Sequence, residues 1–270
     1  MNVLIAGVTG FLGSALSSEC KKHADKVWGL LSRPQLPPTD VEKIFTLHEL
    51  AHANIDFDVI YIAAGNYTLS RHQLAQVNEI LPQLLCDLYP KAKIIFVSST
   101  EVYAPTHKVI TETSPTGTHN PYGISKLLGE QIVLQHQHSA VVRLSYLYDR
   151  RIPNRSFLPT IITHAQEKKV IPLTNNGERV QDYIHVADAA RLLYLATQHT
   201  KKNIFLGASG ESISNTDIAE KICTLVPSCK INYTGESSAP SYIYNPQWTM
   251  NMLAWSPQHH LLDYLQEMVV

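Results

Sequence analysis

The sequence lacks the features that mark membrane, secreted and nucleic-acid-binding proteins. No apolar run in its 270 residues is long enough to span a bilayer, and the first residues, MNVLIAGVTG, lack the charged region and cleavage site of a signal peptide. The formal net charge is only −1, which gives no electrostatic reason to expect a nucleic acid or an anionic membrane as partner. We therefore expect a cytoplasmic protein that binds neither.

Cysteine is also scarce. The four cysteines, Cys20, Cys86, Cys223 and Cys229, are scattered without the spacing that metal sites use. We interpret them as reduced packing residues of a cytosolic protein, and we predict no metal site.

Apolar runs that favour strands alternate with amphipathic, helix-like segments. Continuous apolar strands separated by helices predict a parallel sheet covered on both faces, that is, an α/β protein. A Pro/Asn-rich passage, YDRRIPNRSFLP, marks a change of organisation. We expect residues 1–150 to form the main domain, completed by about 182–207, with 151–181 and 208–270 forming a small C-terminal substrate lobe. The five predicted strand runs are 2–8, 26–32, 58–65, 92–99 and 140–148.

The stretch NPYGISKLLGEQ places Tyr122 four residues before Lys126. Pro121 suits the first position of a helix, so both side chains fall on one helical face, one turn apart. A nearby ammonium favours the phenolate, and we therefore predict a lowered pKa for Tyr122. Such a phenol can exchange a proton with a sugar oxygen while hydride moves to or from a nicotinamide. The alternative is a partly buried tyrosine and a solvated lysine on an ordinary helix.

A glycine turn follows the first predicted strand. Gly7, Gly10 and Gly13 occupy the point where the chain turns into a helix, where free backbone N–H groups and the helix dipole can hold a pyrophosphate. This context predicts a Rossmann-type, doubly wound sheet that binds a dinucleotide. The second strand ends at Ser32 and Arg33 with no acid. Because a guanidinium can pair with a 2′-phosphate, we expect NADP to be preferred over NAD.

Five motifs occur in one order along the chain. They are GVTGFLG, the AAG at 63–65, SSTEVY at 98–103, YGISK at 122–126 and VQDYIHVAD at 180–188. In this the chain resembles the extended short-chain dehydrogenases/reductases, and within them the NAD-dependent epimerase/dehydratase family, which acts mainly on nucleotide sugars.

This resemblance implies roles for individual residues. Tyr122 would be the acid/base, Lys126 would tune it and hold the nicotinamide ribose, and Ser99 would hydrogen-bond the reacting oxygen. The substrate would be a small molecule, most simply a nucleotide sugar. The cofactor contacts it implies are Gly7, Thr9, Gly10, Phe11, Leu12, Gly13, Ala63, Ala64, Gly65, Leu144 and Ser145, with Tyr122 and Lys126.

The sequence departs from the family at two substrate positions. The dehydratases carry an Asp-Glu pair after the position of Ser99, but this chain has Thr100 and Glu101, which argues against 4,6-dehydration. The family's nucleotide-binding arginine is replaced by Gln181, and Arg179, two residues earlier on the same face of an extended segment, can serve instead. We expect Glu101, Arg179 and Gln181 to contact the substrate.

Three functions remain open at this point. The protein is either an epimerase that works through a transient ketone, a ketone reductase, or a non-catalytic dinucleotide sensor on the same fold. The presence of Ser99, Tyr122 and Lys126 together favours an enzyme. The resemblance also implies a homodimer, formed through the helix before Tyr89 and the helix that contains Tyr122.

Overall fold

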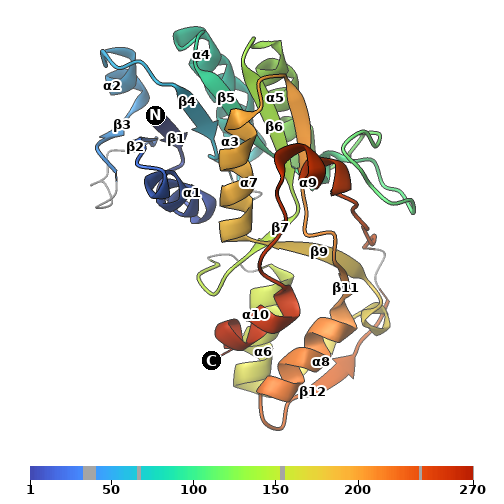
Figure 1. Cartoon of the computed structure of the whole chain (residues 1–270). Coiled ribbons are helices and arrows are strands. Elements are labelled where there is room, and N and C mark those ends of the chain that lie inside the picture. The colour runs from blue at the N-terminus through green and yellow to red at the C-terminus, as the bar shows by residue number, and fades with distance from the viewer. Residues whose placement is uncertain (33–40, 66–67, 153–155, 237–238, 270) are drawn as a thin grey trace.

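The structure is a computed structural model of the whole 270-residue chain. It describes residues 1–32, 41–65, 68–152, 156–236 and 239–269. Arg33, on which the expected cofactor preference depends, lies outside these ranges. The described chain forms a sheet with helices in the upper part of Figure 1 and a smaller lobe below it.

The central sheet is parallel, as the sequence predicts, and it has seven strands. Its order is β3–β2–β1–β4–β5–β6–β10, so the chain winds outward from β1 in both directions. This is a Rossmann-type doubly wound sheet, in which ligands bind beyond the carboxyl ends of the strands near the point where the order reverses. The strands are β1 (Asn2–Ala6), β2 (Lys26–Leu30), β3 (Ile44–Phe45), β4 (Val59–Ile62), β5 (Lys93–Ser99), β6 (Ser139–Leu144) and β10 (Asn203–Gly207).

Helices cover both faces of this sheet (Figure 1). Successive residues of β1 alternate between them: Val3 and Ile5 pack with α1 (Phe11–Lys22) and α7 (Val186–Gln198), and Leu4 and Ala6 face the other side. That other side holds α2 (Leu47–Ala51), α3 (Arg71–Ala75), α4 (Leu81–Leu88) and α5 (Pro121–Gln135), with the π-helical turn η1 (Gln76–Ile80) between α3 and α4. No helix in the described ranges is long and apolar enough to cross a membrane.

The lobe has its own apolar core, which joins three helices to two small sheets. One sheet has the order β11–β9–β7 and the other pairs β12 with β8. Its strands are β7 (Tyr146–Tyr148), β8 (Val170–Leu173), β9 (Val180–His185), β11 (Ser212–Ser214) and β12 (Lys230–Tyr233), and its helices are α6 (Phe157–Lys168), α8 (Asn215–Leu225) and α10 (Leu261–Val269).

The predicted strand over residues 140–148 is wrong as a single element. It divides into β6, which belongs to the central sheet, and β7, which pairs with β9 in the lobe. The break falls at Ser145, whose backbone N–H donates to Gly207 O at 2.9 Å while its hydroxyl donates to Asp182 Oδ1 at 2.7 Å. The chain therefore changes sheets at a residue whose two polar groups are both satisfied.

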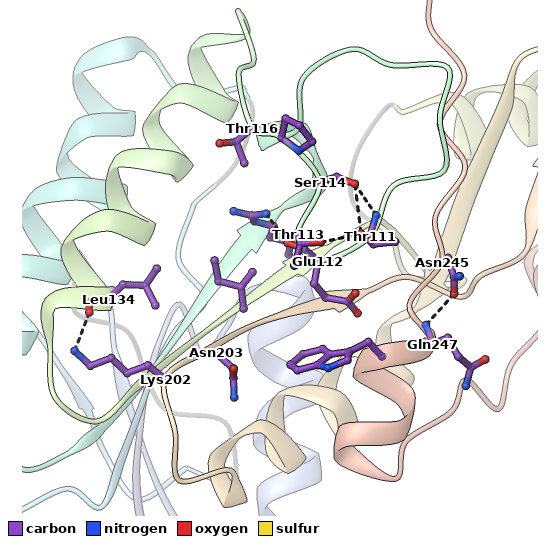
Figure 2. Close-up of a pocket in the computed structure, with 14 residues that line it drawn as sticks. Thr111, Glu112, Thr113, Ser114, Thr116, Leu134, Lys202, Asn203, Asn245 and Gln247 are labelled. Carbon is purple, nitrogen blue, oxygen red and sulfur yellow. Dashed lines mark hydrogen bonds between the residues drawn. The ribbon is translucent and has the colours of Figure 1, made fainter.

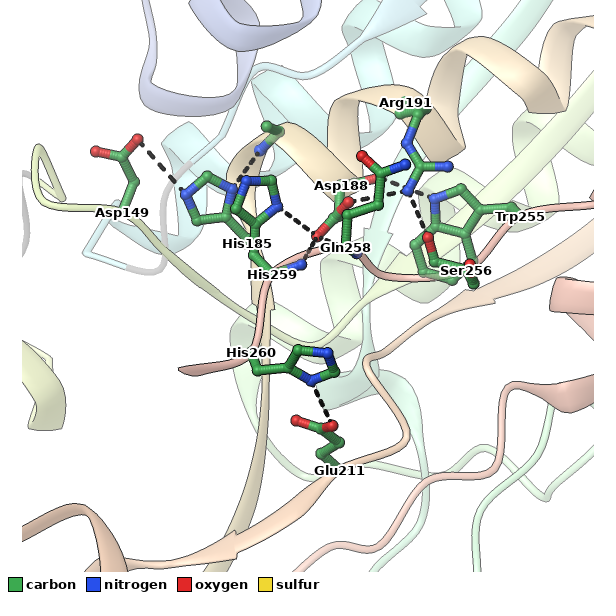
Figure 3. A network of polar contacts seen from close by, with 11 residues as sticks. Asp149, His185, Asp188, Arg191, Glu211, Trp255, Ser256, Gln258, His259 and His260 are labelled. Carbon is green, nitrogen blue, oxygen red and sulfur yellow. Dashed lines mark hydrogen bonds and ion pairs between the residues drawn. The ribbon is translucent and has the colours of Figure 1, made fainter. Parts of the chain in front are cut away.

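The segment after α9 (Gln247–Leu253) is tied to the start of α7 by one buried carboxylate, Asp188 (Figure 3). Asp188 Oδ2 accepts from the backbone N–H groups of Gln258 and His259, both at 3.0 Å, and Arg191 donates to Oδ1 at 3.0 Å. The indole N–H of Trp255 donates to the Asp188 carbonyl at 3.2 Å. Because these bonds converge on one buried residue, they fix the path of the chain between the sheet and α10.

Candidate active site

The start of α5 is built to present Tyr122. The Asn120 side chain accepts from the Tyr122 backbone N–H at 3.0 Å as the N-cap, and Pro121 occupies the first turn. A Cβ on Gly123 would lie 2.3 Å from the carbonyl oxygen of Glu101. Glycine at this position therefore lets α5 pack directly against the backbone that follows β5.

Lys126 lies one turn further along α5 and is almost completely buried. Its ammonium donates to the carbonyl of Val97 at 2.8 Å and lies 5.7 Å from the centroid of the Tyr122 ring. The Ser99 hydroxyl, at the end of β5, hydrogen-bonds the Tyr122 phenol. The structure thus brings the three predicted catalytic side chains together.

The pKa values of this group differ from the sequence prediction. Burial, followed by the negative charge of Glu101, raises the pKa of Tyr122 to about 12, although the hydrogen bond from Ser99 opposes the change. Burial lowers the pKa of Lys126 to about 7, against the influence of the Glu130 carboxylate. The prediction of a lowered pKa for Tyr122 is therefore wrong, because desolvation and the Glu101 carboxylate raise that pKa.

The glycine turn has the geometry that a pyrophosphate needs. Gly7 has φ +88°, which favours glycine, and a Cβ on Gly13 would lie only 2.0 Å from the carbonyl oxygen of Gly7. Gly10 is the N-cap residue of helix α1 and provides no side-chain cap, and the first turn of the helix has no acid. Its first N–H groups and dipole are therefore available to an anion, so the residues present fit a dinucleotide.

One cavity of about 1230 Å³ collects the predicted site residues at the carboxyl ends of the strands. It reaches from the glycine turn after β1, past the ends of β2, β4 and β5, to the start of the lobe. The predicted residues that line it are Gly7, Thr9, Gly10, Phe11, Leu12, Gly13, Ser32, Ala63, Ala64, Gly65, Ser99, Glu101, Tyr122, Lys126, Leu144, Ser145, Arg179 and Gln181.

Glu101 is held in place beside the phenol. Tyr146 OH donates to Glu101 Oε1 and Asn120 Nδ2 donates to Oε2, both at 3.1 Å. Its carboxylate is thus fixed at the boundary between the three predicted catalytic residues and the lobe. The sequence interpretation missed Asn120 and Tyr146, although the NPYGISK stretch contains the first and Tyr146 follows Ser145 directly.

Arg179 and Gln181 both line the cavity but differ in the hydrogen bonds that they make. The Gln181 amide nitrogen donates to Tyr183 OH and to Asn215 Oδ1, both at 2.9 Å, so both of its N–H bonds are used. The Arg179 guanidinium hydrogen-bonds the Tyr146 phenol. Of the two, Arg179 is the residue that offers a charge to an anionic ligand.

A buried asparagine, also missed from the sequence, lies behind the cavity wall near Gly65. Asn78 lies in the π-helical turn η1, and its amide donates to the Ser125 hydroxyl at 3.0 Å. Its Oδ1 has no hydrogen-bond partner among the described residues. A Cβ on Gly65 would lie 3.4 Å from this oxygen and 3.5 Å from Lys126 Nζ. A buried acceptor beside an ammonium fits the hydroxyl groups of a ribose.

A second, more open pocket of about 860 Å³ lies near the β10 edge of the sheet (Figure 2). It is lined by the hydroxyl-rich loop 111–116 and by polar side chains that include Lys202, Asn203, Asn245 and Gln247. None of the described residues that the sequence predicts for the site contributes to this pocket. The candidate site is therefore the larger cavity.

Three side chains beside α7 offer ligand atoms within 4.8 Å of one another, namely His185, Asp188 and His259. The Asp188 oxygens already accept hydrogen bonds, including one from His259 Nδ1 at 2.9 Å. The two imidazole rings stack with centroids 3.9 Å apart and an interplanar angle of 22°, so an ion in the plane of one ring lies outside the plane of the other. We assign this cluster to tethering the C-terminal segment.

The fold and the sheet order define an extended short-chain dehydrogenase/reductase. The chain belongs to the NAD dependent epimerase/dehydratase family, whose family model matches residues 3–206. This confirms the resemblance stated from the five sequence motifs.

The individual relatives have low sequence identity to this chain. A dTDP-glucose 4,6-dehydratase of Neisseria gonorrhoeae is 29% identical over 140 residues, which cover 48% of this chain and 40% of that protein. The uncharacterized UDP-glucose epimerase YtcB of Bacillus subtilis is 26% identical over 230 residues, 71% of each chain. Among solved structures, MoeE5 in complex with UDP-glucuronic acid and NAD has a TM-score of 0.86 at 19% identity and covers 100% of this chain and 98% of its own. At this identity the likeness concerns the fold.

Proposed function

We propose that the protein transfers hydride between a nicotinamide dinucleotide and a carbon of a nucleotide-linked sugar, and that Tyr122 exchanges the proton with the sugar oxygen. A bound nicotinamide supplies or accepts the hydride. The chain's own contribution is to hold the sugar oxygen near the Ser99 hydroxyl and the Tyr122 phenol. The observation that carries the proposal is that Ser99, Tyr122 and Lys126 converge in the cavity that contains the glycine turn.

Ketone reduction is the first candidate. With a pKa of about 12, the Tyr122 phenol is protonated at neutral pH. A protonated phenol can donate to the oxygen of a ketone as hydride arrives at its carbon. Oxidation of a sugar hydroxyl requires the phenolate instead, and the positive charge of an oxidised nicotinamide nearby would favour that form.

Epimerisation at C4 is the second candidate. It is supported by the relatives, since YtcB is described as a UDP-glucose epimerase. In an epimerase the same phenol removes and returns the proton, and the cofactor stays bound through the cycle.

The nucleotide-linked substrate is supported by Arg179. Its guanidinium lines the same cavity as the glycine turn and lies beside the Tyr146 phenol. A guanidinium in that cavity, on a residue other than those of the glycine turn, suits a second phosphate group. The MoeE5 structure contains UDP-glucuronic acid together with NAD, in keeping with such an arrangement.

Product analysis separates the two candidates. The protein is incubated with NAD(P)⁺ or NAD(P)H and a panel of UDP- and dTDP-linked sugars and 4-ketosugars. A reductase consumes reduced nicotinamide in step with the ketone, whereas an epimerase changes the sugar without net redox change. Tight dinucleotide binding with no turnover of any sugar in the panel would instead favour a non-catalytic sensor and contradict the proposal.

We also propose NADP over NAD as the preferred cofactor. Ser32 lines the cavity at the end of β2, where no acid stands to repel a 2′-phosphate, and Arg33 follows it in the sequence. A charge-assisted bond of about 1.5 to 3 kcal/mol corresponds to roughly ten- to a hundredfold in affinity. Calorimetry should show NADPH binding more tightly than NADH, and Arg33→Ala should remove most of that difference. Equal affinities in the wild type would overturn the preference.

The homodimer expected from the sequence is likewise a proposal, and it is supported by exposed apolar side chains on two neighbouring helices. Ile80, Leu84 and Leu88 lie on η1 and α4, and Ile124 and Leu128 lie on α5. Both sets are spaced by four residues, so each forms a stripe along its helix. Ile80 and Leu84 also line the larger cavity, so the apolar patch that remains for an interface between copies consists of Leu88, Ile124 and Leu128. The cytoplasmic location stays a prediction that cell fractionation can test.

A further inference from the structure

Two cysteines of the lobe lie in direct sulfur contact. The Sγ atoms of Cys223 and Cys229 are 3.0 Å apart, and both side chains are partly accessible. A disulfide requires about 2.05 Å between the sulfurs, so a side-chain movement of about 1 Å would bring them to bonding distance.

The local backbone produces this approach. Cys223 lies in the last turns of α8, and Val226 and Pro227 end that helix. Ser228 has φ +64°, a conformation that L-residues rarely adopt, and the Cys229 N–H donates to Val226 O at 3.1 Å. This tight turn folds the chain back so that Cys229 lies over the end of the helix that carries Cys223.

We propose that Cys223 and Cys229 form a reversible disulfide by exchange with an oxidant of the glutathione disulfide class. The Cys229 thiolate attacks the oxidant and releases one glutathione thiolate, leaving glutathione bound to Cys229. Cys223 then loses its proton to solvent, and its sulfur attacks that of Cys229 and displaces the second glutathione. The protein loses two protons and two electrons, and the oxidant is reduced to two glutathione molecules.

The contact between the thiols supports this order of attack. The Cys223 thiol donates its hydrogen bond to the Cys229 sulfur. Burial, followed by this hydrogen bond, raises the pKa of Cys223 to about 12. Cys223 therefore keeps its proton in the reduced protein, and Cys229 is the thiol available for the first attack.

The two other cysteines differ from this pair in exposure and in their neighbours. Cys20 and Cys86 are buried on opposite faces of the central sheet. Burial raises their pKa values to about 12 and about 11. Without exposure or a neighbouring thiol, they are inert packing residues. The sequence interpretation of all four as packing residues did not separate the pair, because the turn at Ser228 has no clear sequence signal.

The bond would cross-link α8 to β12. Cys229 immediately precedes β12, whose first residue Lys230 pairs with Val170 of β8. At its other end α8 begins with Asn215, which accepts from the Gln181 amide in the cavity. The disulfide therefore stiffens one edge of the lobe that carries the substrate-side residues, without removing any group from the cavity.

The test is a titration of the intact protein with reduced and oxidised glutathione. As the mixture becomes oxidising, the denatured chain should fall from four free thiols to two, and its mass should fall by two hydrogen atoms. Peptide mapping should join Cys223 to Cys229. Amide hydrogen exchange in residues 230–233 should slow on oxidation and recover on reduction.

Single variants supply the control. Cys223→Ser should give no loss of two hydrogens and should instead retain one glutathione on Cys229. Cys86→Ser should form the bridge as the wild type does. The proposal is overturned if the wild type keeps four thiols under oxidising glutathione, if it accumulates glutathione adducts without a bridge, or if the joined peptides contain another cysteine.

Discussion

At the scale of single residues, the main feature is the Tyr122 phenol, whose surroundings raise its pKa. Burial and the fixed Glu101 carboxylate raise the pKa of Tyr122, and the Ser99 hydroxyl stays hydrogen-bonded to it. Lys126 is so buried that its own pKa falls to about 7. The site thus carries less charge than the sequence suggests.

Lys126 makes stability depend on pH in a defined window. Its pKa is about 7 in the folded chain and about 10.5 when unfolded, so between these values the unfolded chain binds more protons. The free energy of unfolding should therefore rise with pH from about 7 towards 10, by at most about 1.4 kcal/mol per pH unit from this group. Urea unfolding of the wild type and Lys126→Met at several pH values measures the difference.

In Lys126→Met this contribution should be absent, so the stability gap between variant and wild type should shift in favour of the wild type as pH rises. A gap that stays constant from pH 7 to 10 would mean that Lys126 remains solvated and charged in the folded protein.

At the scale of elements, the sequence was sufficient for the cofactor side of the site. Short apolar runs separated by helices predict the parallel sheet, and parallel strands bring their carboxyl ends to one edge. The glycine turn, Ser99 and the Tyr122–Lys126 helix could therefore be placed together before any coordinates were known. Each of these features depends on a short stretch of chain.

The substrate side could not be predicted in the same way. The division of residues 140–148 at Ser145 depends on Asp182 and Gly207, which lie far away in sequence. The pairing of β8 with β12 joins segments about sixty residues apart. The contact between Tyr146 and Glu101 likewise joins residues 45 positions apart, and no local periodicity encodes it.

The close packing of α1 against the glycine turn predicts the effect of one substitution on stability and dinucleotide affinity. In Gly13→Ala the new Cβ would meet the Gly7 carbonyl at 2.0 Å, so the helix start must move. We expect stability to fall by about 1 to 3 kcal/mol and dinucleotide affinity to fall by about tenfold or more. Thermal unfolding and calorimetry measure the two effects.

Gly235→Ala is the matched control, because a Cβ there has nothing within 4 Å although φ is +53°. It should cost some stability through its backbone conformation and leave dinucleotide affinity unchanged. Wild-type affinity in Gly13→Ala would show that the turn does not contact the cofactor.

At the scale of the whole molecule, the exposed stripes on α4 and α5 predict self-association. Leu88→Glu combined with Leu128→Glu places two charges on the apolar patch, away from the cavity lining. Sedimentation should show a dimer for the wild type and a monomer for the double variant. Val109→Glu, at an equally exposed apolar position in a loop, should remain dimeric.

A monomeric wild type would contradict the predicted dimer. It would not contradict the proposed site, since the residues that line the cavity come from one chain. Dimerisation would then be absent despite the patch, and the patch would need another occupant.

The most direct test of the central claim is the turnover of Tyr122→Phe on the substrate that the sugar panel identifies. The ring and its packing remain while the proton carrier is lost, so we expect turnover to fall by roughly a hundredfold or more with dinucleotide affinity unchanged. Tyr233→Phe, an exposed phenol on β12, should retain full activity. Near-normal turnover in Tyr122→Phe would contradict the account, because Tyr122 would then not carry the proton.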